Sequence, residues 1–165
     1  MEGLAHPFGL DHLLAMVAVG VWSVAALPAS KAWQGPATFL LALVLSAVLG
    51  ASGVTLPYLE HAIALSVSLF GLMLIVAAKP MPKTFGLGLI ATAACLHGLA
   101  HGAETPVTGF AGYAAGFLLT TAVLHGGGVG MGLSIRRWLA GRSGTVLTTL
   151  GGTLGVAGVY LFTHV

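Results

Sequence analysis

The stretch HGLAHGAE, residues 97–104, carries side chains whose types and spacing could bind a metal ion. His97, His101 and Glu104 are separated by four and three residues, which places them on one face of an α-helix. A histidine pair at i, i+4 can chelate one metal ion, and the carboxylate would add an oxygen about one turn further along. Two glycines beside the histidines narrow this helix, so a neighbouring helix could come close.

A second stretch, HPFGLDHLLAM (6–16), brings similar side chains to the start of another apolar segment. Imidazole nitrogen and carboxylate oxygen suit divalent first-row metals such as Ni²⁺, Co²⁺ and Zn²⁺. Ionisable side chains at membrane depth are costly and usually mark the path of a substrate. The two stretches together predict one metal site with these ligands: His6, Asp11, His12, His97, His101 and Glu104.

For some of these residues the sequence leaves a simpler interpretation open. Asp11 near a helix N-terminus could serve simply to stabilise the helix dipole, and Glu104 could simply mark the boundary with water. A single histidine near a helix end, such as His61 or His164, is more typical of a hydrogen-bonding residue at the membrane interface than of a ligand. The case for binding therefore depends most on the pair His97 and His101.

Three further residues are candidates for a metal path through the protein: Glu60, His61 and His125. Glu60 and His61 are adjacent and begin an apolar segment of their own. His125 is followed by five glycines between residues 126 and 132. These glycines predict either a closely packed helix end or an unwound segment whose carbonyl groups could pass a cation.

The composition defines the class of protein. The chain has 165 residues, of which 57% are hydrophobic and only 6% are charged, whereas soluble domains carry about a quarter charged residues. We therefore expect an integral membrane protein with one domain, 1–165, and the lipid bilayer as its surroundings. The net charge of +2, without a basic cluster, argues against nucleic-acid binding. The single cysteine allows no internal disulfide.

Six stretches are apolar enough and long enough to cross a bilayer, which takes roughly 20 residues. Proline and glycine turn signals separate them. The expected helices cover about residues 8–27, 36–54, 58–78, 84–103, 107–128 and 143–162. The predicted fold class is thus all-α, an integral membrane bundle of six transmembrane helices.

The charged residues are sorted between the two ends of these segments. All six basic residues fall in alternate connections: Lys31, Lys79, Lys83, Arg136, Arg137 and Arg142. The positive-inside rule places these connections in the cytoplasm and both termini outside. The first residues lack the basic and apolar regions of a signal peptide, although an outside N-terminus fits a chain once led by one. All four acidic residues fall at the other, outer ends.

Three motifs resemble the HupE/UreJ family of nickel/cobalt permeases, which are linked with hydrogenase and urease maturation. They are HPFGLDHLLAMVAVG (6–20), HGLAHGAE (97–104) and GFLLTTAVLHGGGVGMG (116–132), and the resemblance covers essentially the whole chain. It implies a bacterial inner-membrane protein that moves Ni²⁺, or Co²⁺, into the cytoplasm, where nickel-receiving metallochaperones would be its partners. It also implies that the predicted ligands act on the metal as substrate, without a resident cofactor.

One departure from the family pattern concerns the first motif. The family has one more residue between His-Pro and Gly-x-Asp-His, whereas here His6 stands five residues before Asp11. This is the spacing of the separate nickel/cobalt permease family, and it would place His6 at a different angle. The GxxxG patterns at Gly112/Gly116 and Gly151/Gly155 fit either packing within the bundle or a homo-oligomer.

We expect a transporter that is not an enzyme and does not use ATP, because the chain has no nucleotide-binding motif. An enzyme alternative is an intramembrane hydrolase in which three histidines and an aspartate hold Zn²⁺ and activate water. A third alternative is a haem protein with His61 and His97 as axial ligands.

Overall fold

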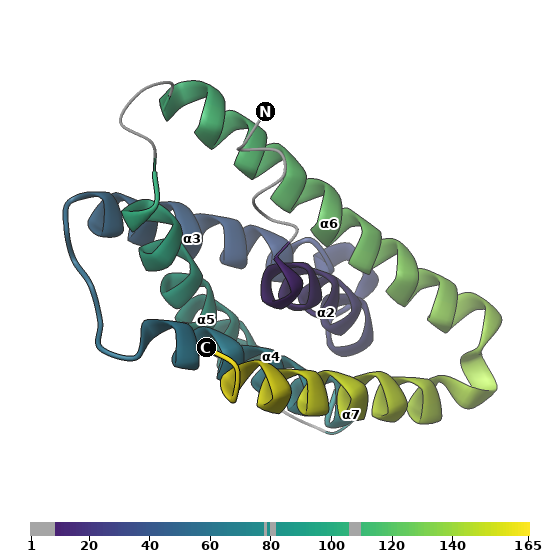
Figure 1. The fold of residues 1–165 in the computed structure, drawn as a ribbon. Helices are drawn as coiled ribbons and strands as arrows, with labels where there is room; N and C mark the ends of the chain where they lie inside the picture. Colours follow the sequence, from purple (N-terminus) through teal and green to yellow (C-terminus); the bar gives the residue numbers. More distant parts are fainter. Residues whose placement is uncertain (1–8, 78, 80–81, 106–109) are drawn as a thin grey trace.

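The computed structural model describes residues 9–77, 79, 82–105 and 110–165, and these form a bundle of helices without strands (Figure 1). The described helices are α2 (Leu10–Ala26), the short η2 (Ala29–Lys31), α3 (Gln34–Ala51), α4 (Leu59–Ile75), α5 (Lys83–Ala103), α6 (Phe110–Trp138), the short η3 (Ala140–Arg142) and α7 (Ser143–Phe162). The predicted all-α class is therefore confirmed.

Five of these helices follow the expected ranges within a few residues, and α6 does not. The glycine run after His125 was expected to mark a closely packed helix end or an unwound segment. The close packing is confirmed, but the helix end and the unwinding are wrong, because α6 continues to Trp138. Packing explains the difference. Gly128 lies against the backbone of Val17, and Gly132 lies against Val24, so close contact with α2 outweighs the low helix propensity of glycine.

Three helix pairs approach each other closely, and glycines make each approach possible. α2 packs on α6, where a Cβ on Gly20 would lie 2.5 Å from the backbone oxygen of His125. α3 packs on α5, where Gly98 lies against the backbone of Leu43. α4 packs on α7, where a Cβ on Gly71 would lie 2.5 Å from the backbone oxygen of Gly151. Small residues of this kind are typical of contacts between membrane helices.

The packing also fixes the directions of the helices. In α2 and α6, residues 17 and 24 face residues 128 and 132, so these two helices run in parallel. In α4 and α7, residues 71 and 68 face residues 151 and 158, so these two run antiparallel. Both relations agree with six helices that cross the bilayer in alternate directions, because that arrangement makes the first and fifth helices parallel and the third and sixth antiparallel. The acidic and basic residues are separated as expected. Asp11, Glu60 and Glu104 lie at one end of the bundle, and the basic residues lie toward the other.

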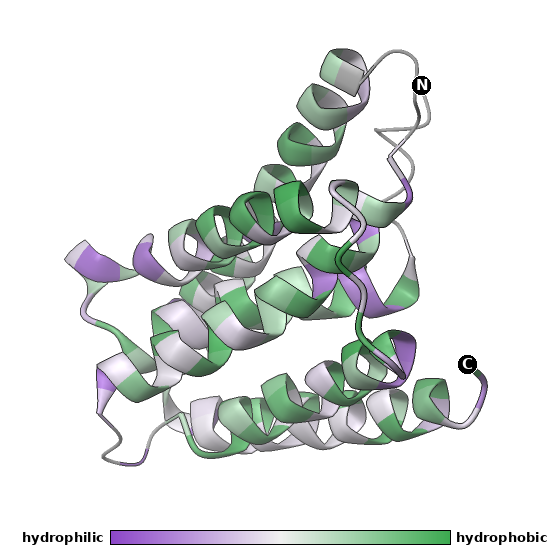
Figure 2. Cartoon of the chain, turned by 90° about the vertical axis from the view of Figure 1, so that its left-hand side faces the viewer, coloured by the Kyte–Doolittle hydropathy of each residue, from purple (hydrophilic) through white to green (hydrophobic). Residues whose placement is uncertain are grey.

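Within the part of the chain that the structure describes, four helices are long and apolar enough to cross a membrane: Ala29–Ala51, Lys83–Ala103, Ala111–Trp138 and Ala140–Phe162. α2 and α4 have 17 residues each, at the lower limit for a spanning helix. α2 lies at the centre, in contact with α3, α4 and α6. Large apolar side chains cover the outer faces, for example Leu45 and Val156, and Figure 2 shows hydrophilic segments mainly at the helix ends. This is the surface of a membrane protein.

Candidate metal site

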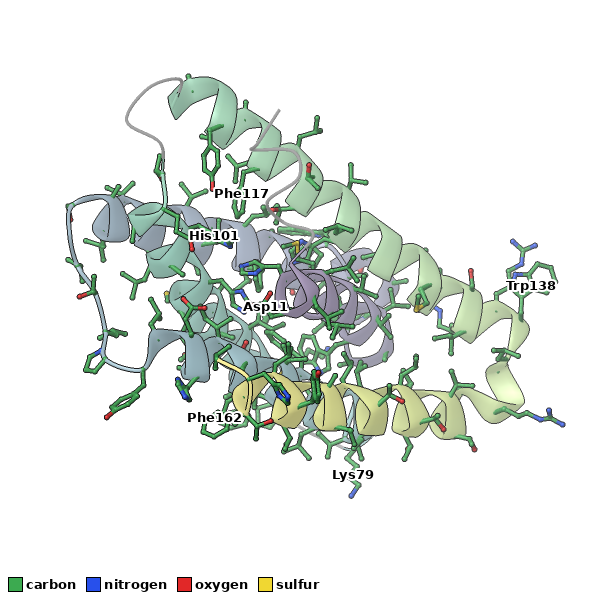
Figure 3. The ribbon with its side chains drawn as sticks, in the orientation of Figure 1. Asp11, Lys79, His101, Phe117, Trp138 and Phe162 are labelled. Carbon is green, nitrogen blue, oxygen red and sulfur yellow. The ribbon has the colours of Figure 1, made fainter. Side chains whose placement is uncertain are left out.

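Three imidazoles converge between α2 and α5. His12 lies in the first turn of α2, and its Nε2 atom is 2.8 Å from Nδ1 of His97. The same Nε2 atom also contacts Nε2 of His101, one turn further along α5. All three side chains are buried. In Figure 3, Asp11, at the start of α2, and His101, on α5, are near each other, and Trp138 marks the C-terminal end of α6. We call His12, His97 and His101 the histidine triad.

Each imidazole of the triad turns one nitrogen toward the other imidazoles, and its second, outer nitrogen lies near an oxygen atom. Nδ1 of His12 lies 3.1 Å from Oδ1 of Asp11, which also accepts a 2.8 Å hydrogen bond from the His12 backbone. Nδ1 of His101 lies 3.5 Å from Oε2 of Glu104. Nε2 of His97 lies 3.0 Å from Oγ of Ser66, on α4. An ionised carboxylate can only accept, so Asp11 and Glu104 favour an N–H on the outer nitrogen and a lone pair on the inner one.

Lone pairs that converge in this way are suited to bind a divalent cation, because a metal-bound imidazole usually donates its other N–H to a nearby oxygen. With metal–nitrogen bonds of about 2.1 Å, neighbouring ligand nitrogens stand about 3 Å apart or more. The triad is somewhat tighter than this. Accordingly, among the described residues no group of three or more ligands already surrounds a common metal position. The imidazoles would have to separate slightly when the ion enters.

Carboxylates gather around the entrance to the triad. The Glu104 side chain is 51% exposed and that of Asp11 is 26% exposed, so both face the solvent end of the site. Glu60, exposed in the first turn of α4, is close enough for electrostatic interaction with both of them. Such a concentration of negative charge attracts cations and raises their local concentration.

Two phenylalanines border the triad. The Phe39 ring lies 5.7 Å from the His97 ring on one side and 4.9 Å from the His125 ring on the other. The Phe117 ring of α6 lies 4.6 Å from the His101 ring, and Figure 3 shows it reaching toward α5. Beside His101, an apolar cavity of about 230 Å³ opens between α3, α5 and α6. The triad is thus enclosed by apolar groups on the sides away from the carboxylates.

His125 is buried as deeply as the triad but stands apart from it, behind Phe39. Its Nδ1 atom donates a 2.8 Å hydrogen bond to the carbonyl of Thr121. Its Nε2 atom has no hydrogen-bond partner within the part of the chain that the structure describes. A buried imidazole nitrogen without a hydrogen-bond partner is unusual, and its lone pair could bind an ion that reached it.

The other predicted residues do not join the triad. The His61 ring contacts the rings of Tyr58 and Phe162. The haem alternative is therefore not supported, because the two nitrogens of His97 face Ser66 and His12 and not His61. His6 lies outside the described residues. Sequence reasoning missed Phe39, Ser66 and Phe117, because nothing distinguishes them from the other apolar and small residues of their helices.

Comparison with known proteins identifies the family. The model of the HupE / UreJ protein family matches residues 1–161. The chain belongs to the HupE/UreJ family. Protein HupE of Rhizobium leguminosarum bv. viciae is 40% identical to it over 163 residues, which are 98% of this chain and 83% of that protein. No solved structure matches.

Membership of the HupE/UreJ family confirms the resemblance seen in the three motifs. It assigns the chain to the accessory proteins of hydrogenase and urease that are associated with nickel and cobalt transport. This is consistent with a protein that is not an enzyme, and the comparisons do not support the intramembrane hydrolase. The role of individual residues as metal ligands stays a prediction.

Proposed function

We propose that the protein is a permease, driven without ATP, that moves Ni²⁺ or Co²⁺ across the bacterial inner membrane into the cytoplasm. The observation that carries this proposal is the histidine triad, in which three buried imidazoles turn one nitrogen toward a common point. Each imidazole has an oxygen atom at its other nitrogen. Lone pairs this close together repel each other unless a proton or a metal ion lies between them, so the cluster is suited to take up a divalent cation in exchange for protons.

In this proposal all six long helices cross the membrane as one domain, with both termini outside. The parallel pair α2 and α6, the antiparallel pair α4 and α7, and the separation of acidic from basic residues support it. The positive-inside rule puts the end with the basic residues in the cytoplasm. The acidic end with the triad then faces outward, where the metal arrives. A homo-oligomer and cytoplasmic metallochaperones as recipients belong to the same proposal.

The ion would first meet the carboxylates of Asp11, Glu60 and Glu104. It would exchange water for the nitrogens of the triad, with His6 as a further candidate ligand. It would then pass Phe39 to Nε2 of His125, which has no hydrogen-bond partner among the described residues, and continue toward the basic end. A divalent cation entering a negative cell gains about 4.6 kcal/mol per 100 mV, twice the single-charge value. Conduction requires ligands that release the ion again.

The test is uptake of ⁶³Ni²⁺ into proteoliposomes that contain wild type, Asp11→Asn or His97→Ala, with Co²⁺ and Zn²⁺ as competitors. His164→Ala is the matched control, because His164 is exposed and its imidazole hydrogen-bonds to Tyr160 and Thr163, far along the chain from the triad. We expect uptake by the wild type and the control and its loss in the other two variants. Metal binding by the wild type without any uptake would overturn the transport proposal.

A further inference from the structure

Ser66 of α4 links a third helix to the histidine triad. Its side chain is buried, with 4% of the residue exposed. Oγ lies 2.7 Å from the carbonyl oxygen of Ile63, to which it donates, and 3.0 Å from Nε2 of His97. A serine hydroxyl has one hydrogen and can donate only once. Because the carbonyl takes that hydrogen, Oγ must accept from His97, and Nε2 must carry the N–H.

This hydrogen bond determines which nitrogen of His97 is available to an ion. A neutral imidazole carries one N–H, so an N–H on Nε2 leaves a lone pair on Nδ1. Nδ1 is the atom that lies 2.8 Å from Nε2 of His12, at the centre of the triad. The opposite tautomer would direct an N–H into the triad, where it would repel a cation.

We propose that Ser66 is a positioning residue that holds His97 in the tautomer able to bind the transported metal through Nδ1. This inference rests on the proposed function. Asp11 and Glu104 also favour an N–H on the outer nitrogen, in His12 and His101 respectively, but each of them adds a negative charge next to the ion. Ser66 orients His97 without a charge, at a position where the residue His97 is completely buried and water has no access. The ion is therefore held by a correctly oriented ligand but is not trapped by a third nearby carboxylate.

The tautomer can be measured without any metal. In protein labelled with ¹⁵N-histidine and held in detergent micelles, the ¹⁵N shifts of His97 should show Nε2–H, with the signals assigned by their loss in His97→Gln. Ser66→Ala should move His97 toward the Nδ1–H form or toward a mixture of tautomers. If the wild type shows Nδ1–H, Ser66 donates to His97 instead, and the inference is overturned.

The affinity for metal supplies the second measurement, by calorimetric titration of Ni²⁺ and Co²⁺ into purified protein. Partners of the outer nitrogen of a metal-binding histidine typically change affinity by about 10- to 100-fold. We expect a loss of this size in Ser66→Ala and recovery in Ser66→Thr, which keeps the hydroxyl. The matched control is Ser23→Ala: Ser23 is also buried and donates to a carbonyl of its own helix, at Val19, but no contact of it with an imidazole is found in the described residues.

The melting temperature of the metal-free protein separates a specific effect from a general one. Ser66→Ala should lower it more than Ser23→Ala, because it also leaves the buried N–H of His97 without a partner. Both variants should still be folded at the temperature of the titration, and only Ser66→Ala should weaken binding. Equal affinity in wild type and Ser66→Ala would overturn the inference while leaving the transport proposal intact. If the wild type itself bound neither metal, the proposed function would fail, and the ¹⁵N tautomer would still decide whether Ser66 orients His97.

Discussion

Two regions of the described structure contain buried imidazoles, and they are built differently. In the triad of His12, His97 and His101, every nitrogen faces another imidazole or an oxygen atom. At His125, one nitrogen donates to a carbonyl of its own helix, and the other has no partner within the described residues. The triad joins two helices and is supported by α4, whereas His125 belongs to α6 alone.

This difference suggests a division of labour. Several nitrogens with fixed outer partners make a site that can select and hold an ion, because the ligands are already oriented. A single imidazole with one open nitrogen can offer an ion only one weak bond, which suits a place that the ion leaves quickly. Under this interpretation the triad sets affinity and His125 sets the rate of passage.

The largest expected effect tests the triad. His12 supplies the Nε2 atom that faces both other imidazoles, so His12→Ala removes the centre of the site. We expect Ni²⁺ affinity to fall by more than about 100-fold, beyond the range typical of partners at an outer nitrogen. Titration calorimetry measures it, with His164→Ala as the control. Affinity within a few-fold of the wild type would mean that the ion binds elsewhere.

Much of this region could be predicted from the sequence, and the reason is local periodicity. The spacing of His97 and His101 fixes their common face, and the charge pattern places Asp11 and Glu104 at the same end of the bundle. The bounds of α7 also agree with the expected helix. The helix face and the helix bounds depend only on residues close together in the chain, and the common end depends only on the order of apolar segments and charged connections.

The parts that the sequence did not predict depend on contacts between distant segments. In the sequence, Ser66 does not differ from other small residues, and only the packing of α4 beside α5 brings it to His97. Phe39 likewise does not differ from other apolar residues, and only the fold places it between two histidines. The glycine run of α6 reads as a helix end until α2 lies against it. Lateral packing of membrane helices leaves little trace in a single sequence, because lipid-facing and buried residues are equally apolar.

A smaller effect tests His125. In His125→Ala the triad is intact, so the Ni²⁺ affinity should stay within about twofold of the wild type, whereas uptake should slow by about tenfold, the effect of about 1.4 kcal/mol on the barrier. His125→Gln keeps a side-chain oxygen that can meet the ion and should recover part of the rate. The measurements are calorimetry and initial ⁶³Ni²⁺ uptake on the same preparations. A loss of affinity as large as in His12→Ala would show that His125 and the triad form one binding site.

The smallest effect concerns Glu104, at the outer edge of the triad. Its side chain is half exposed and its Oε2 atom lies 3.5 Å from Nδ1 of His101, a longer contact than Asp11 makes with His12. An exposed charge is screened by salt and contributes little, so Glu104→Gln should weaken Ni²⁺ binding by only about two- to fivefold. The loss should shrink further between low and high salt in the titration. A salt-independent loss near that of His12→Ala would show instead that Glu104 binds the ion directly. The triad would then extend to the solvent end of α5, and affinity would no longer be confined to the buried imidazoles.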